Sequence, residues 1–240
     1  MPINFKEYLD RNSYRQDANP NRLRLYRGHN SADWKLYSSY SRFCENNNYA
    51  FDLRNFELML DRFTNESSYY FGKEMNKFNY LQRIALAQHY GVPTPFLDWT
   101  ESPYIAVFFA IRDRTLRDTK TFTVWRMEID RKADYYLEGE YDEENLPNDF
   151  YIIKTKALDS KRIWKQQGYF SYLSSDISLN DYLDSNNPGI DIIPYEIIGE
   201  DWVSIMKELK LMGINHGSIF DNLDGIARDT VLDFCITQKK

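Results

Sequence analysis

The segment at residues 88–103 reads Gln88-His89-Tyr90-Gly91-Val92-Pro93-Thr94-Pro95-Phe96-Leu97-Asp98-Trp99-Thr100-Glu101-Ser102-Pro103. It begins at the end of an apolar, helically spaced run over residues 79–90. Gly91 can adopt the left-handed conformation that ends a helix, and Pro93 follows two residues later. We therefore expect a helix over 79–90 that stops at a sharp turn.

The second half of this segment predicts a strand and then another helix. Residues 95–97 are typical of a short buried strand. Ser102 can cap a new helix, with Pro103 at its first position. Residues 103–112 are nearly all apolar, so this helix should be buried on most of its sides.

Outward from this segment, apolar spacing predicts an α+β protein. Leu23 to Tyr26 alternate as a short strand that stops at Arg27-Gly28, and residues 135–149 form an acidic loop. Helices are expected at 4–10, 51–65, 202–212 and 226–237, and strands at 121–129, 150–155, 168–173 and 190–198. The 240 residues carry no internal repeat or linker. We predict a single domain over 1–240, with a mixed, mostly antiparallel sheet flanked by helices.

Composition limits the classes of function. The formal net charge of -6 argues against broad, charge-driven binding to nucleic acid, although it does not exclude a local basic pocket. The two cysteines form no CxxC pair, so we predict neither a metal site nor a disulfide framework. The first residues lack a signal-peptide pattern and no apolar run is long enough to span a membrane. We expect a cytoplasmic protein with no membrane contact.

The first candidate site is Tyr26-Arg27-Gly28 at a strand end. A guanidinium fork matches two oxygens of a phosphate or carboxylate, and glycine lets a ligand approach the backbone closely. The ordinary interpretation of the same residues is a salt bridge and a turn.

The second candidate site lies in the opening segment. His89 could transfer a proton or donate a hydrogen bond, or it could simply be a satisfied core histidine. Asp98 and Thr100 could line a pocket, or they could cap the next helix. The free N–H groups around Ser102 are those that meet an anion at a helix start.

A third segment at residues 162–170 is basic and aromatic. Such a segment can contact a nucleotide through stacking and charge. The alternative is an edge strand that places Trp164 and Phe170 in the core.

Together these three segments resemble the FRG family, which is named for its Phe/Tyr-Arg-Gly motif. Tyr26-Arg27-Gly28 stands as that motif. The matching residues further along are Trp34, Leu36, Arg42, Gln88 to Gly91, Pro93-Thr94, Leu97 to Thr100, Ser102-Pro103, Arg162, Gln167-Gly168, Gly213-Ile214 and Leu223 to Gly225. The core motifs run over about 22–225. Pro95 stands where many members have Arg, and Asp221 where many have Pro.

A weaker resemblance connects the chain to Arg-Ser-Glu type ADP-ribosyltransferases. Tyr26-Arg27-Gly28 is similar to their first motif, and Thr100 to Pro103 resemble their Ser-Thr-Ser strand. In that family the Arg holds NAD and a late Glu orients the ribose. Here the late Glu is not evident, with Gln167 the nearest positional candidate and Glu196 a poorer one. An amide cannot carry the negative charge that such a position needs.

These resemblances imply a domain that binds NAD or a related nucleotide and acts as a toxin or phage-defence effector, with a protein as acceptor or partner. Arg27 would hold phosphate or ribose hydroxyls, and Gln167 would lie near the scissile bond. The expected catalytic residues are Arg27, His89, Asp98 and Gln167. The expected cofactor-binding residues are Tyr26, Gly28, Tyr90, Thr100 and Ser102.

Two other classes of function stay open. One is a non-catalytic module that senses a nucleotide or phosphorylated ligand, which the absent Glu favours. The other is a nucleic-acid-cleaving toxin in which Arg27, His89 and Lys165 perform phosphate chemistry, although the acidic charge balance counts against it.

Overall fold

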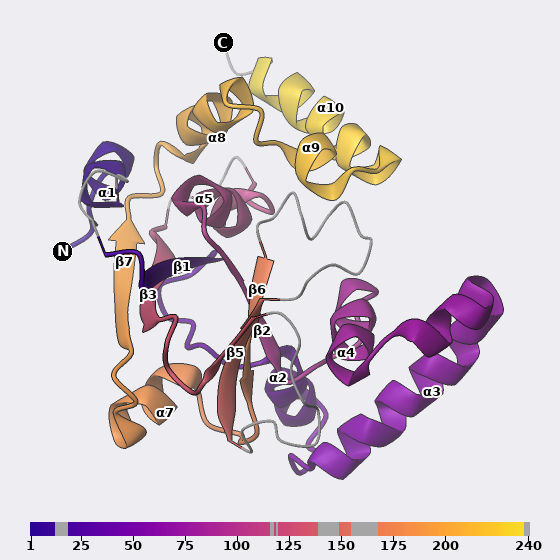
Figure 1. Ribbon diagram of the computed structural model, residues 1–240. Helices are drawn as coiled ribbons and strands as arrows, with labels where there is room; N and C mark the ends of the chain where they lie inside the picture. Colours follow the sequence, from indigo (N-terminus) through magenta and orange to yellow (C-terminus); the bar gives the residue numbers. More distant parts are fainter. Residues whose placement is uncertain (13–18, 116–117, 119, 139–148, 155–167, 238–240) are drawn as a thin grey trace.

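The computed structural model describes residues 1–12, 19–115, 118, 120–138, 149–154 and 168–237. Within these residues, seven strands form one sheet in the order β4-β5-β6-β2-β1-β3-β7 (Figure 1). The strands are β1 (Arg22–His29), β2 (Phe96–Thr100), β3 (Phe122–Asp130), β4 (Tyr136–Glu138), β5 (Phe150–Lys154), β6 (Gly168–Leu173) and β7 (Asp191–Ile197). Every pair is antiparallel except β4 with β5, which is parallel. The α+β class and the mostly antiparallel sheet are therefore confirmed.

Helices cover both faces of this sheet. They are α1 (Phe5–Asn12), α2 (Ser39–Asn46), α3 (Leu53–Phe71), the 3-10 helix η2 (Gly72–Lys77), α4 (Tyr80–His89), α5 (Pro103–Ile111), α7 (Leu179–Asn186), α8 (Trp202–Leu211), α9 (His216–Phe220) and α10 (Leu223–Thr237). In Figure 1, α5 and α8 to α10 gather at one end of the sheet, and α2 to α4 gather at another.

Near the middle of the sheet, the neighbouring strands β1 and β2 share very little strand pairing. β1 pairs with β3 along its whole length, from Arg22↔Asp130 to His29↔Thr123. Against β2, on its other side, it makes one registered pair, Tyr26↔Thr100. Beyond that pair, no strand pairing joins the two strands within the described residues. The residues that follow Tyr26 on β1 and precede Thr100 on β2 therefore make no registered pair with each other.

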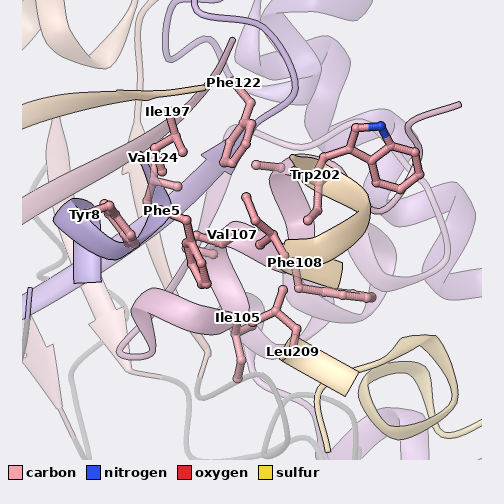
Figure 2. Packing of buried hydrophobic residues seen from close by; sticks show 14 of the residues in the cluster. Phe5, Tyr8, Ile105, Val107, Phe108, Phe122, Val124, Ile197, Trp202 and Leu209 are labelled. Carbon is pink, nitrogen blue, oxygen red and sulfur yellow. The ribbon is translucent and has the colours of Figure 1, made fainter. Parts of the chain in front are cut away.

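Helix α5 lies in the core and fixes the position of β1. It packs against β1, β3 and α8, and its Phe108 side chain is fully buried, as is Leu209 from α8 (Figure 2). This burial on several sides explains the almost uninterrupted apolar sequence of the helix. A Cβ on Gly28 would lie 2.0 Å from the carbonyl oxygen of Ala106, so only glycine allows α5 to approach the strand this closely.

A second core lies between the sheet and α2, α3 and α4. Phe96 and Phe170 from adjacent strands stack at 5.2 Å between ring centroids and are both buried in it. Leu81 and Ile84 of α4 are fully buried in the same cluster. This cluster fixes α4 against β2, so that the end of the helix lies close to the point where β1 and β2 separate.

Most predicted boundaries hold, but the strand predicted at 95–97 is Phe96–Thr100 and the helix predicted at 51–65 is Leu53–Phe71. Three further corrections follow. The first strand does not stop at Arg27-Gly28 but continues to His29, because β3 pairs with it throughout. The 135–149 region is not entirely loop, since β4 pairs with β5 there. The short helices α2, α7 and α9 were not predicted, because their sequences are polar and lack a long apolar stripe. Within the described residues, no helix has both the length and the apolar character that a membrane crossing requires.

Candidate functional site

A cavity of about 250 Å³ lies where β1 and β2 separate, and it is lined by residues from β1, β2, β6, α4 and α5. Its described lining residues are Tyr26, Arg27, Gly28, Ala85, Gln88, His89, Asp98, Trp99, Thr100, Ala106, Phe109, Arg112, Gly168, Tyr169 and Phe170. The cavity thus joins the first two candidate segments, which lie about sixty to seventy residues apart in the sequence.

Arg27 supplies the hydrogen bonds that strand pairing would otherwise make. Its Nη1 donates to the backbone oxygen of Asp98 at 2.8 Å, and its Nε donates to Nε2 of His29 at 3.2 Å. Nη1 also lies 3.6 Å from the Asp98 carboxylate. Within the described residues, Nη2 makes no hydrogen bond. A guanidinium that is held at two positions thus keeps donors available on the wall of a cavity.

Burial makes this guanidinium unusual. Its side chain is only 17% exposed, and desolvation lowers the pKa of Arg27, while the Asp98 carboxylate acts in the opposite direction. The neighbouring cations Arg42 and Arg112 also lower it. An arginine remains protonated under these conditions, so the cavity wall carries a partly desolvated positive charge. A partly desolvated charge gains more free energy on binding an anion than a fully solvated charge does.

His29 is a neutral imidazole that accepts a hydrogen bond from Arg27. The histidine is buried, and its Nδ1 lies 3.2 Å from the backbone oxygen of Trp34. Because Nε2 accepts from Arg27, Nδ1 must carry the proton and donate to that oxygen. Burial, and then the adjacent Arg27 charge, lower the pKa of His29 from 6.5 to about 3. The tautomer is therefore fixed, and His29 orients the guanidinium.

Asp98 is held in a second chain of hydrogen bonds that reaches the turn after α4. Nε2 of Gln88 donates to Oδ1 of Asp98 at 2.6 Å. The hydroxyl of Thr94 in turn donates to Oε1 of Gln88, and the backbone N–H of Thr94 donates to Oγ of Ser39 at 2.9 Å. Thr94 is fully buried. The buried threonine therefore fixes the orientation of the glutamine amide, and the amide fixes the carboxylate.

His89 also lines the cavity, and it is the last residue of α4. It is partly buried, and its ring meets the ring of Tyr90 edge to face at 5.0 Å between centroids. Arg27, His89 and Asp98, which the sequence analysis gave as expected catalytic residues, line this one cavity. Asp98 is 60% exposed at its side chain, so solvent or a ligand reaches its second oxygen.

Rings and a second cation also line the cavity. Phe109 comes from α5, Arg112 is the residue that follows this helix, and Phe170 comes from β6. The guanidinium carbon of Arg112 lies 5.1 Å from the ring centroids of both Phe109 and Phe220. Its Nε donates to Asp113 at 3.1 Å, and its side chain is 28% exposed. The cavity wall therefore combines apolar ring carbons with two positive groups, Arg27 and Arg112.

The remaining predicted site residues have different positions. Tyr26 and Thr100 line the cavity and are almost fully buried, and burial raises the pKa of Tyr26 to about 12. Ser102 caps α5 by accepting the N–H of Ile105 at 3.2 Å, and it is not among the lining residues. Tyr90 is 61% exposed and does not line the cavity either. Gln167 and the third segment up to that residue lie outside the described residues.

Carboxylates other than Asp98 are not among the described lining residues. Glu101 accepts a hydrogen bond from the hydroxyl of Tyr169, so its charge is used in bracing β6 against β2. Glu196 lies on β7, opposite Thr123 of β3. Neither residue is among the described residues that line the cavity. Within the described residues, no group of three or more His, Cys, Asp or Glu side chains is placed to hold a metal ion.

Sequence reasoning assigned no role to three residues of this arrangement. His29 follows Arg27 by two residues on the same strand, so strand alternation alone places the two on one face. Gln88 precedes His89 in the last turn of α4, and Arg112 is the first cation after the apolar run of α5. The sequence position of His29 therefore indicates a contact with Arg27. The positions of Gln88 and Arg112 do not indicate a contact, because their surroundings depend on how α4 and α5 pack against the sheet.

One family model matches the chain. Residues 22–119 match the model described as FRG domain. The match includes β1, α4, β2 and α5, and with them Arg27, His89 and Asp98. The later blocks at 162–170 and 213–225 lie beyond the matched residues. No curated protein matches the chain, and no solved structure matches it.

Proposed function

The chain contains an FRG domain, and on that premise we propose that the Arg27 cavity binds NAD or a related nucleotide and that the domain acts as an ADP-ribosyltransferase or NAD glycohydrolase. The observation that carries the proposal is the state of Arg27. It is a desolvated, doubly anchored guanidinium with donors left over on a cavity wall. Such a group suits the paired oxygens of a phosphate or a ribose diol.

The other lining residues support a nucleotide over a simple anion. The partly buried Phe109 and the buried Phe170 make part of the cavity wall apolar, as the ring parts of a nucleotide require. The outer oxygen of Asp98 can accept a ribose hydroxyl, as carboxylates do in dinucleotide sites. The residues present therefore fit the phosphate, sugar and ring parts of NAD.

NAD supplies an N-glycosidic bond, whose cleavage releases nicotinamide and leaves ribose C1′ bonded to the incoming acceptor, either water or a protein nucleophile. The chain would contribute positioning and proton transfer. Arg27 would hold the phosphate side, and Asp98 would orient the ribose. His89 is the titratable cavity residue that could take the proton of the acceptor. In this proposal, Gln167 is the residue near the scissile bond.

The test is release of nicotinamide from NAD by the purified protein, followed by NMR. We expect turnover that falls at least about 100-fold in Arg27→Gln, and more than tenfold in His89→Ala, because general acid–base groups contribute on the order of 100-fold or more. Arg62→Gln serves as the control, since Arg62 is 80% exposed and pairs with Glu66 on α3. Turnover that is unchanged in Arg27→Gln would contradict the proposed site.

A specific observation also favours a second candidate, a nucleotide-sensing module without catalysis. The lining carboxylate in the described residues is Asp98, which is already paired with Arg27 and Gln88. A carboxylate that is committed in this way is poorly placed to stabilise a developing positive charge. NAD affinity that depends on Arg27, with no nicotinamide released, would select the sensing module over the enzyme.

A role as a toxin or phage-defence effector follows from the same proposal. A domain that consumes NAD would arrest growth of its host when it is expressed. The expected result is arrest by the unaltered chain and normal growth with Arg27→Gln at equal protein level. Equal arrest by both forms would show that the cavity is not the source of any toxicity.

A further inference from the structure

A second cavity adjoins the first and shares part of its wall. It has a volume of about 170 Å³ and is lined by residues of α2, of the turn after α4 and of β2. Arg27, Gln88 and Asp98 line both cavities, so these three side chains form a partition between them. A ligand that crosses this partition would touch the same arginine from both sides.

The second cavity carries its own cation, Arg42. This residue comes from α2, and its Nη1 donates to the backbone oxygen of Tyr37. Within the described residues, no carboxylate lies within ion-pair distance of Arg42. Desolvation lowers the pKa of Arg42, while the charge of Asp98 raises it. Arg42 itself is exposed, so within the described residues it is a solvent-accessible positive charge without a close acidic partner.

The charge balance of the second cavity favours an anion. Arg27 and Arg42 contribute two positive charges, and Asp98 contributes one negative charge, whose Oδ1 is already bonded to Gln88. The hydroxyl of Ser39 is likewise used, because it donates to the backbone oxygen of Thr94 at 3.1 Å and accepts from the N–H of the same residue. The groups left for a ligand are therefore mainly guanidinium donors.

The volume agrees with a small anionic group. A water occupies about 30 Å³ in the liquid, so the cavity has room on the order of five waters. That space suits phosphate oxygens and is too small for a nucleoside. The first cavity, with its rings, is the larger of the two. Together they reach the range of about 300–1,000 Å³ that is typical of small-molecule sites.

We propose that the second cavity is a diphosphate subsite, in which Arg27 and Arg42 jointly hold the two phosphate groups of the ligand. The inference rests on the proposed function, because it assigns the phosphate end of the same nucleotide. One nucleoside part enters the first cavity over Asp98 and Gln88, and the other part extends from Arg42 toward solvent. The ligand class is therefore a nucleoside diphosphate or dinucleotide, and a nucleoside monophosphate should bind more weakly.

The test is calorimetric titration of the full chain with three probes, namely inorganic phosphate, inorganic pyrophosphate and ADP-ribose. We expect pyrophosphate to bind more tightly than phosphate. Arg42→Gln should weaken pyrophosphate and ADP-ribose by about tenfold or more, and Arg42→Lys should give intermediate affinity, because it keeps the charge and loses the fork. Arg62→Gln should leave all three affinities unchanged. Circular dichroism of each variant confirms that the fold is retained.

The results separate this subsite from the nucleotide proposal. If no nicotinamide is released and NAD does not bind, but pyrophosphate affinity still depends on Arg42, the subsite stands and the NAD proposal falls. If NAD or ADP-ribose binds with equal affinity in the unaltered chain and in Arg42→Gln, the subsite is wrong and the first cavity alone binds the ligand. Failure of all three probes to bind the unaltered chain would also overturn it.

Discussion

At the scale of single residues, Arg27 has two roles, which are tied to its position. It donates to the Asp98 backbone oxygen where β1 and β2 no longer pair, and it presents further donors to the cavity. The ordinary interpretation of an arginine at this place, a structural brace, is therefore correct and does not exclude the functional one. A substitution of Arg27 will affect stability as well as binding, so variants must be compared at equal folded concentration.

His29 predicts a pH dependence of stability. Its folded pKa of about 3 lies below its ordinary value of 6.5, so the unfolded chain binds a proton between these values when the folded chain does not. Stability should therefore be independent of His29 above about pH 6.5 and should fall as the pH drops toward 3. The total loss is several kcal/mol, at about 1.4 kcal/mol for each pH unit.

The measurement is urea unfolding from pH 7 to pH 4 for the unaltered chain and for His29→Gln. Glutamine can accept from Arg27 and donate to the Trp34 oxygen without titrating. We expect a shallower fall of stability with decreasing pH in the variant. Parallel curves for the two proteins would mean that His29 protonates freely in the folded state.

Gly28 predicts a large loss of stability on the smallest substitution. In Gly28→Ala the new methyl group would lie 2.0 Å from the Ala106 oxygen and 2.7 Å from the Ala110 nitrogen, which are both backbone atoms of a buried helix. Because neither atom can move away cheaply, we expect a loss of about 3 kcal/mol or more in thermal or urea unfolding. Gly213→Ala is the comparison, with a positive φ of 78° and no atom within 4 Å of the added group. It should cost about 1 kcal/mol. A Gly28→Ala protein as stable as Gly213→Ala would contradict the close packing of α5 on β1.

At the scale of elements, an aspartate of α10 accepts several hydrogen bonds from the start of α9. Asp229 of α10 accepts the N–H of His216 at 3.1 Å and that of Gly217 at 2.8 Å, and it pairs with Nδ1 of His216 at 2.9 Å. His216 is buried against Phe108 of α5, with 5.0 Å between the ring centroids. Through His216, this contact connects α9 and α10 to α5, whose residues line the cavity.

Asp229→Ala should cost about 2 to 4 kcal/mol, because it leaves partly buried donors without an acceptor. Thermal unfolding measures this loss. Asp233→Ala on the same helix is the matched control, since its ion pair with Lys210 is about half exposed on both sides. The control should cost less than about 1 kcal/mol. Similar costs for the two variants would mean that the buried contact stabilises no more than a surface ion pair.

Element by element, the chain's own residues predicted the parts that carry a strong local pattern. The apolar run of α5, its Ser102 cap and the turn at Gly91, whose φ is 88°, were all predictable. The short helix α2 was not, because its eight residues include only Tyr40, Phe43 and Cys44 as apolar positions, and its stability comes from the Ser38 cap and from packing. That omission mattered for function, since α2 carries Arg42.

At the scale of the whole molecule, the sheet order could not be predicted, because it depends on pairs that are distant in the chain. β1 pairs with β3, about a hundred residues later, and barely with β2. This uneven pairing creates the opening that Arg27, Asp98 and His89 line. The motif residues therefore indicated which side chains matter, and strand alternation placed His29 beside Arg27, but only the fold shows that Gln88 holds Asp98. The net charge of -6 also did not predict that three arginines, Arg27, Arg42 and Arg112, line two adjoining cavities.

The central claim is that Arg27 makes this opening a nucleotide site, and the most direct measurement is the dissociation constant of NAD for the unaltered chain and for Arg27→Gln. Calorimetry should give micromolar binding for the unaltered chain. In Arg27→Gln the affinity should fall about 100-fold, because a charge-assisted contact contributes on the order of 2 to 3 kcal/mol. Arg62→Gln should bind as the unaltered chain does. Equal NAD affinity in Arg27→Gln, or no binding by the unaltered chain, would contradict the account.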